Sequence, residues 1–196
     1  MKLGICVPSG RDWKAAFGSS LIGLVRHLER SGVDYDVFLQ MGASVLPRAR
    51  QKAVEWAKSI NATHLLCIDD DMQFTPDCVQ SLLSHDVDIV AANYVTKVAR
   101  QPVTHGIDGA AVTSADKLGL QEVGWVGFGM VLIKLDAIKD IPAPLFEMRW
   151  MEERKDFIGE DFYFCGKVRA HGVKIYVDHD ASQGLGHVGD CNYREV

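Results

Sequence analysis

The chain has 196 residues, of which 47% are hydrophobic and 24% charged, a balance typical of a soluble globular protein with one substantial core. No stretch approaches the roughly 20 apolar residues that a membrane-spanning helix needs. The net charge of −5 excludes a global basic field that would draw the chain to nucleic acid, although it leaves room for a local basic patch.

The first ten residues contain only a brief apolar run before Pro8, so we expect a first strand here and not a signal peptide. The five cysteines are odd in number and form no CxxC pair, which argues against a disulfide framework or a zinc site. Free thiols fit a reducing compartment, and we expect the protein in the cytoplasm.

Strand and helix patterns alternate through the first half of the chain. Short apolar runs predict buried strands, and stretches such as the one containing Leu21, Leu24 and Leu28 have helical spacing. Thr75 followed by Pro76 is a typical helix start. The expected elements are strands Leu3–Val7, Asp34–Leu39, His64–Ile68 and Asp88–Ala92, and helices Ala15–Arg30, Val45–Ile60 and Thr75–Ser84. This alternation predicts an α/β fold with a mainly parallel central sheet and helices on both faces.

The second half is less regular. Residues 93–122 are compatible with short strands or with a long active-site loop. The remaining expectations are a glycine-rich segment leading into a strand over Val123–Ile133, a helical turn at Asp136–Lys139, a loop over a cleft at Ile141–Arg154, a helix at Phe162–Ala170, a last strand at Val173–Val177 and a polar tail from Asp178.

Three consecutive carboxylates, Asp69, Asp70 and Asp71, directly follow the apolar run of the third strand. Ligands of open α/β sheets bind at the carboxyl ends of strands, and carboxylates crowded there are most simply balanced by a divalent cation. Oxygen-rich sites suit Mg²⁺, Mn²⁺ or Ca²⁺. The alternative is a solvated acidic turn at the positive end of a helix.

Two further acidic residues, Glu160 and Asp161, open the expected helix at 162–170. Carboxylates are stabilising at a helix start, and this explanation suffices when the pair is taken alone. The functional interpretation is a general base that takes a proton from a substrate hydroxyl, assigned to Asp161 with Glu160 as helper. His187, flanked by glycines late in the chain, is a candidate third metal ligand, with His179 as its competitor.

Basic and glycine-rich positions complete the candidate site. Arg11 follows the first expected strand, and Arg50 lies near the start of the second expected helix. The arginine guanidinium binds phosphates through two parallel hydrogen bonds. Trp125 lies among glycines that allow close approach of a ligand. No GxxxxGK[ST] motif is present, which excludes the P-loop class of nucleotide-binding proteins.

In this order, the motifs resemble the GT-A glycosyltransferases, particularly family-2-like and compact phage or bacterial members. The matching segments extend over nearly the whole chain: Val7-Pro8, the helix with Arg50, the DxD motif Asp69-x-Asp71, Asn93-Tyr94, the segment 126–134, Glu160-Asp161, the IYVD strand and Gly186–Gly189. The resemblance implies a single GT-A domain over 1–196, with a nucleotide-binding half at 1–95 and a sugar- and acceptor-binding half at 96–196.

The resemblance also implies a nucleoside diphosphate sugar as donor, with a UDP-sugar expected. Mn²⁺ or Mg²⁺ would be held by Asp69, Asp71 and His187, and Asp161 would be the base, assisted by Glu160. The residues implied in donor binding are Pro8, Ser9, Arg11, Arg50, Asp69, Asp70, Trp125, Gly127, Phe128 and Gly129. A late metal-binding histidine also occurs in retaining members, so the stereochemical outcome stays open.

Two other functions fit the same residues, namely a nucleotidyltransferase and a non-catalytic nucleotide-sugar-binding module. The acceptor is open as well. A glycan is the usual acceptor of such enzymes, and a hydroxymethylated base in phage DNA is a minority hypothesis. The basic residues available for DNA phosphates are Lys97, Arg100, Arg149, Arg154 and Lys155, but the net charge of −5 weakens this alternative.

Overall fold

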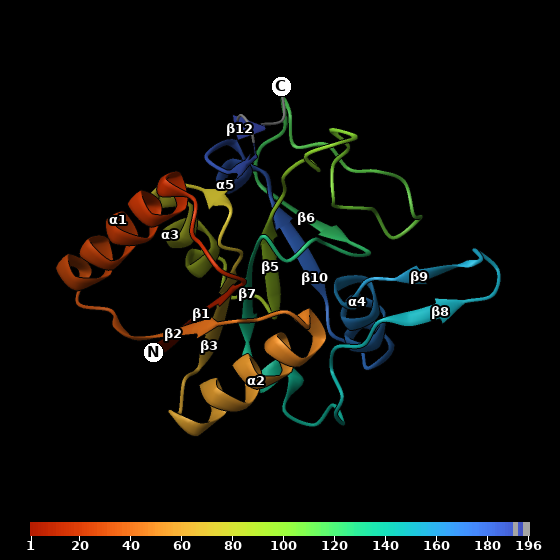
Figure 1. Ribbon diagram of the computed structural model, residues 1–196, viewed down its shortest axis with the longest axis horizontal. Coiled ribbons are helices and arrows are strands. Elements are labelled where there is room, and N and C mark those ends of the chain that lie inside the picture. Colours follow the sequence, from red (N-terminus) through yellow and green to blue (C-terminus); the bar gives the residue numbers. More distant parts are fainter. Residues whose placement is uncertain (190–191, 194–196) are drawn as a thin grey trace.

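The computed structural model describes residues 1–189 and the backbone of the short strand Asn192–Tyr193. Its centre is a sheet that, within this part of the chain, has seven strands in the order β2-β1-β3-β7-β5-β10-β6 (Figure 1). The strands are β1 Lys2–Ser9, β2 Asp34–Met41, β3 His64–Ile68, β5 Ile89–Ala92, β6 Leu120–Val123, β7 Met130–Lys134 and β10 Ile175–Asp178.

Five of these strands run in one direction. β1 is parallel to β2 and β3, and β10 is parallel to β5. β7 lies between β3 and β5 and is antiparallel to both, and β6 is antiparallel to β10. The expected mainly parallel sheet is therefore confirmed, with two antiparallel strands that the second half of the chain contributes.

Helices cover both faces of the sheet, as expected (Figure 1). The helices are α1 Ala15–Ser31, α2 Leu46–Ser59, α3 Pro76–Ser84, α4 Glu160–Ala170 and α5 His179–Gln183, with a 3₁₀ turn at Leu135–Ile138. One core joins α1, α3 and α5 to the sheet, and the other joins α2 and α4 to its opposite face. Alternate residues of β3 serve the two cores: Leu66 and Ile68 face one, whereas Leu65 and Cys67 face the other.

Two small sheets were not expected from the sequence. The short strand β4 Met72–Gln73 pairs with β11 Gly186–Val188, and β11 pairs with β12 Asn192–Tyr193. Within the expected loop Ile141–Arg154 the chain forms strand β8 Arg149–Met151, which pairs with β9 Asp156–Ile158. That expectation was partly wrong, because the last residues of the segment belong to a β-hairpin that extends from the body beside α4 (Figure 1).

The polar tail after Asp178 also contains more order than expected. Its first residues form α5, whose start is capped by the Asp178 carboxylate accepting a hydrogen bond from the backbone N–H of Ala181 at 3.0 Å. In the part of the chain that the structure describes, no helix is long and apolar enough to cross a membrane.

Candidate active site

The site lies where β1, β3 and β5 end, at the edge of the sheet to which parallel strands direct their carboxyl ends. The backbone N–H of Asp69 donates to the carbonyl of Gly129 at 3.1 Å, which ties the acidic segment to the glycine-rich segment before β7. The N–H of Val188 donates to the carbonyl of Asp71 at 2.7 Å, which ties it to β11. Three segments distant in sequence therefore meet around the aspartates.

Asp71 and His187 come together through the pairing of β4 with β11, in which His187 is opposite Met72. The Nε2 atom of His187 lies 3.2 Å from Oδ2 of Asp71. The other ring nitrogen, Nδ1, lies 3.0 Å from the carbonyl oxygen of Val95, which can only accept, so Nδ1 carries a proton. In the protonated ring Nε2 also carries a proton and donates to the Asp71 carboxylate, whereas in the neutral ring the lone pair of Nε2 faces that carboxylate.

Burial disfavours ionisation of Asp71, but hydrogen bonds from His187 and Lys97 outweigh it and lower the pKa of Asp71. The Lys97 ammonium contacts the same Oδ2 atom. Of the residues expected to contact DNA phosphates, Lys97 is therefore bonded to a carboxylate inside the site.

These two side chains fit a divalent cation. A lone pair and a carboxylate oxygen that face each other repel unless a positive charge lies with them, and in this structure Lys97 supplies that charge. The backbone carbonyl that fixes the tautomer of His187 is a typical outer partner of a metal-binding histidine. Within the described residues, no group of three or more His, Cys, Asp or Glu side chains is placed to hold a metal ion, so the protein would supply two ligands here.

Asp69, the other residue of the DxD motif, is paired with Arg50. Nη2 of Arg50 donates to Oδ1 of Asp69 at 3.1 Å, and Nε of Arg50 donates to Oε1 of Glu160 at 3.0 Å. The guanidinium also lies 4.7 Å from the centre of the Phe128 ring. Arg50 is only 3% exposed, and its Nη1 has no hydrogen-bond partner among the described residues.

Burial disfavours the charged form of Arg50, but Asp69, Cys67 and Glu160 outweigh it and raise the pKa of Arg50. The pKa of Asp69 is raised as well, chiefly by burial, in spite of the pairing with Arg50. A buried arginine thus joins the acidic motif after β3 to the acidic motif that opens α4, 110 residues later.

Asp161 lies in the first turn of α4, and its Oδ1 accepts a hydrogen bond from the N–H of Phe162 at 2.7 Å. Burial raises the pKa of Asp161, and the nearby Glu160 adds to this effect, whereas Phe162 and Arg50 oppose it. Glu160 itself is bound to Arg50. Of the two carboxylates, Asp161 is therefore the one without an ionic partner among the described residues.

Tyr94 is a site residue that sequence reasoning did not assign. Its hydroxyl oxygen accepts a hydrogen bond from the N–H of Gly129 at 3.2 Å, and its ring lies edge-on to His187 with centroids 5.2 Å apart. A Cβ atom at Gly127 or Gly129 would come within 2.7 Å of the Tyr94 side chain. Glycine is therefore required at these two positions, because any larger residue would clash with Tyr94. The close spacing of the glycines is the feature of the sequence that could have indicated this packing.

The other predicted donor-binding residues are distributed around this centre. Pro8 and Ser9 end β1 and are buried, and Ser9 Oγ has no hydrogen-bond partner in the described part of the chain. Arg11 is exposed and Asp70 half-buried. Phe128 is 1% exposed and packs in the core against Phe146 and Phe164, with the Arg50 guanidinium over its ring.

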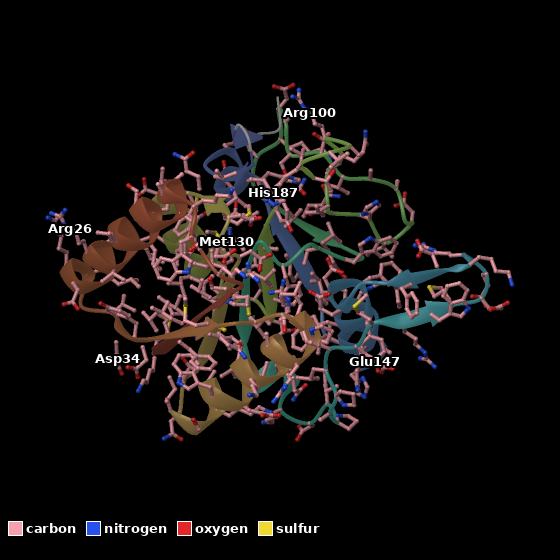
Figure 2. The ribbon with its side chains drawn as sticks, viewed as in Figure 1. Arg26, Asp34, Arg100, Met130, Glu147 and His187 are labelled. Atoms are coloured by element: carbon pink, nitrogen blue, oxygen red, sulfur yellow. The ribbon has the colours of Figure 1, made fainter. Side chains whose placement is uncertain are left out.

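Trp125 stacks on His105 with ring centroids 5.1 Å apart, and its edge meets Phe162 at 4.7 Å. The competing histidine, His179, is buried, with its ring nitrogens 2.8 Å from Ser114 Oγ and 3.0 Å from Gln121 Oε1. His187 is therefore the histidine that the fold brings to the aspartates, and it lies near the middle of the molecule in Figure 2.

No family model matches the chain, and no curated protein matches its sequence. Solved structures match its fold. Protein A197 from STIV is 18% identical with a TM-score of 0.64, covering 97% of this chain and 87% of that one. A mutant Drosophila β-1,4-galactosyltransferase 7 in complex with manganese, UDP-Gal and xylobiose is 13% identical with a TM-score of 0.59, covering 96% and 71%.

GalNAc-T7 with UDP, GalNAc and Mn²⁺ is 11% identical with a TM-score of 0.61, covering 96% of this chain and 44% of that chain. At such low identity the likeness concerns the fold, and in each case it extends over almost all of this chain. Together with the mixed seven-stranded sheet and the helices on both faces, it shows that this protein has the GT-A glycosyltransferase fold.

Proposed function

We propose that this protein is a metal-dependent glycosyltransferase that moves a sugar from a nucleoside diphosphate sugar, expected to be a UDP-sugar, to an acceptor hydroxyl. The observation that carries the proposal is the meeting of Asp71 with His187. The Arg50 network supports it, because it joins Asp69 to Glu160, the residue that precedes Asp161 in α4. The fold supports it, because two solved neighbours were crystallised with Mn²⁺ and a uridine nucleotide. We expect the protein to act in the cytoplasm.

On the donor side, we assign the residues to metal binding and to nucleotide binding. Asp71 and His187 would hold Mn²⁺ or Mg²⁺, with Asp69 at the ribose side and the donor and water completing the coordination. When bound, such a cation stabilises the negative charge of the diphosphate leaving group. Pro8, Ser9 and Arg11 would border the nucleotide.

On the acceptor side, Asp161 would take the proton of the attacking hydroxyl. The hydroxyl oxygen forms a bond to the anomeric carbon, the bond from that carbon to the diphosphate breaks, and the nucleoside diphosphate leaves. Glu160 serves by holding Arg50, and through it Asp69, and does not act as a second base. The raised pKa of Asp161 suits a general base, since a base is most effective when its pKa is near the working pH.

The test is a panel of UDP-, GDP-, CDP- and dTDP-sugars incubated with the protein and Mn²⁺, read by release of nucleoside diphosphate. A parallel panel of nucleoside triphosphates with sugar 1-phosphates detects pyrophosphate, which would instead indicate a nucleotidyltransferase. Asp71→Asn should lower nucleoside diphosphate release at least about 100-fold and weaken Mn²⁺ binding in titrations with UDP.

The matched control is Asp77→Asn, which removes an exposed carboxylate in the first turn of α3 and should behave like the unaltered protein. Full Mn²⁺-dependent activity in Asp71→Asn would refute the metal assignment. Donor binding without turnover on any acceptor would favour the non-catalytic binding module.

A further inference from the structure

The hairpin of β8 and β9 forms one wall of a groove, and one side of α4 forms the other. The groove has a volume of about 630 Å³ and is lined by Trp150 and Glu152 from the hairpin and by Phe162 and Lys167 from the helix, among others. A groove of this size is large enough for a small organic ligand. Asp161 does not itself line the groove, but it directly precedes Phe162, which does.

A chain of ring contacts joins this groove to the centre of the site. The guanidinium carbon of Arg154 lies 5.3 Å from the centroid of the Phe162 ring, and Phe162 contacts Trp125 with centroids 4.7 Å apart. Trp125 belongs to the glycine-rich segment proposed to line the donor sugar. A ligand in the groove would therefore contact Phe162, which in turn contacts the segment proposed to line the donor sugar.

The hairpin exposes aromatic surface that the fold does not use. Trp150 is 47% exposed and Phe157 is 58% exposed, although they are cross-strand partners with centroids 5.3 Å apart. The Trp150 ring is held in place by this edge-on contact and by its Nε1–H, which donates to Oε2 of Glu152 at 2.7 Å. Exposed apolar surface on a fixed ring indicates a binding partner more than a packing role.

The balanced charges of the hairpin favour a neutral partner over a polyanion. Residues 149–158 contain three basic and three acidic side chains, so their formal charges sum to zero, and the groove itself is lined by two of each sign. Glu152 is already paired with Lys155. Such a surface offers little electrostatic gain to a polyanion, because nucleic-acid affinity comes from unpaired basic charge.

We propose that this groove binds the acceptor and that the acceptor is a neutral carbohydrate whose ring packs on Trp150; this inference rests on the proposed glycosyltransferase function. A sugar ring has an apolar C–H face that suits an indole and a rim of hydroxyls that suits carboxylates and cationic side chains. Glu152, Glu153, Arg149 and Lys167 provide these groups around the ring. The charge balance of the hairpin thus favours a glycan over a base in DNA.

The test is saturation-transfer NMR of the whole protein with lactose, cellobiose and maltose, and separately with a short thymidine oligonucleotide. At least one disaccharide should receive saturation, and Trp150→Ala should weaken its binding about tenfold, whereas Trp150→Phe should keep most of it. Ile22→Ala, which removes an exposed apolar side chain on the distant helix α1, is the matched control and should change nothing (Figure 1).

The proposal is overturned if no disaccharide receives saturation, or if Trp150→Ala binds as the unaltered protein does. It is also overturned if the oligonucleotide binds and Trp150→Ala abolishes that binding, because the groove would then serve a nucleic acid. The measurement requires no turnover. Saccharide binding can therefore succeed where the donor panel fails, and fail where the panel succeeds, so the two proposals are tested separately.

Discussion

At the scale of single residues, Arg50 is the side chain on which most of the site depends. Its planar fork donates to Asp69 and Glu160 from two different nitrogens, a geometry that a lysine cannot reproduce. Because it is buried, removing it would leave two acidic groups without their common partner. The sequence suggested Arg50 as a phosphate ligand. In the structure, Arg50 forms ion pairs with the carboxylates of Asp69 and Glu160.

Asp161 provides a prediction in which stability and activity oppose each other. Burial raises its pKa, so its charged form costs folding free energy at every pH above that pKa, and protonation on acidification relieves the cost. Asp161→Asn should therefore be as stable as the unaltered protein or more so at pH 7, since an asparagine oxygen can still accept from the N–H of Phe162. Transfer should fall about 10²- to 10⁴-fold.

Calorimetry at pH 7 and transfer assays over a range of pH check this prediction. In the unaltered protein, transfer should decline on acidification at a pH above the ordinary aspartate pKa, because the base is lost as it takes up a proton. Asp140→Asn, at an exposed position, is the control. A clear drop in the melting temperature of Asp161→Asn would show that its carboxylate is structural.

At the scale of elements, the glycine-rich segment before β7 is shaped by Tyr94. A Cβ atom at Gly129 would lie 2.6 Å from Cε1 of Tyr94 and 3.1 Å from Sδ of Met72, both in buried side chains. Gly129→Ala should therefore destabilise the protein by about 1–3 kcal/mol, the usual cost of overpacking. It should also weaken Mn²⁺ binding, because the ring it displaces packs against His187.

Thermal unfolding and Mn²⁺ titration with UDP measure the two effects. The matched control is Gly18→Ala within α1, where a Cβ atom would meet nothing within 4 Å and where alanine favours the helix. That variant should be slightly more stable than the unaltered protein. Equal stability of Gly129→Ala and the unaltered protein would mean that Tyr94 can move without cost.

The elements also show how much of the fold could be predicted from the sequence. Helices and strands with clear periodicity, such as α1 and β3, begin and end within about two residues of their expected bounds, because local burial patterns determine them. The pairing of Asp71 with His187 was proposed through the family resemblance. What creates it is the short pairing of β4 with β11, too brief for any pattern of hydropathy to indicate.

The ion pair of Arg50 with Glu160 and the hairpin of β8 and β9 were missed for related reasons. The first joins residues 110 positions apart, and no periodicity encodes such a contact. The second is a two-stranded ribbon with exposed aromatic residues on both strands, so its sequence lacks the alternation of apolar and polar residues that marks a half-buried strand.

At the scale of the whole molecule, one sheet with a different hydrophobic core on each face carries every part of the site. The acidic motifs come from the ends of β3 and the start of α4, the histidine from β11, and the proposed acceptor platform from a hairpin outside the body (Figure 1). The two ends of the proposed reaction therefore differ in their surroundings. The donor side is packed into the sheet, whereas the acceptor side depends on a projecting ribbon that can change with little effect on the core.

The position of β7 has a consequence for how the chain is made. β7, residues 130–134, lies between β3 and β5 in the sheet. These two earlier strands are therefore not hydrogen-bonded to each other and are joined only through the later strand. During synthesis, the facing edges of β3 and β5 would therefore stay unpaired until β7 has left the ribosome. We expect stalled nascent chains ending after Ala92 to be cleaved readily by protease. Chains long enough to expose Lys134 outside the ribosome should be more resistant, and equal resistance in the shorter chains would contradict this order of assembly.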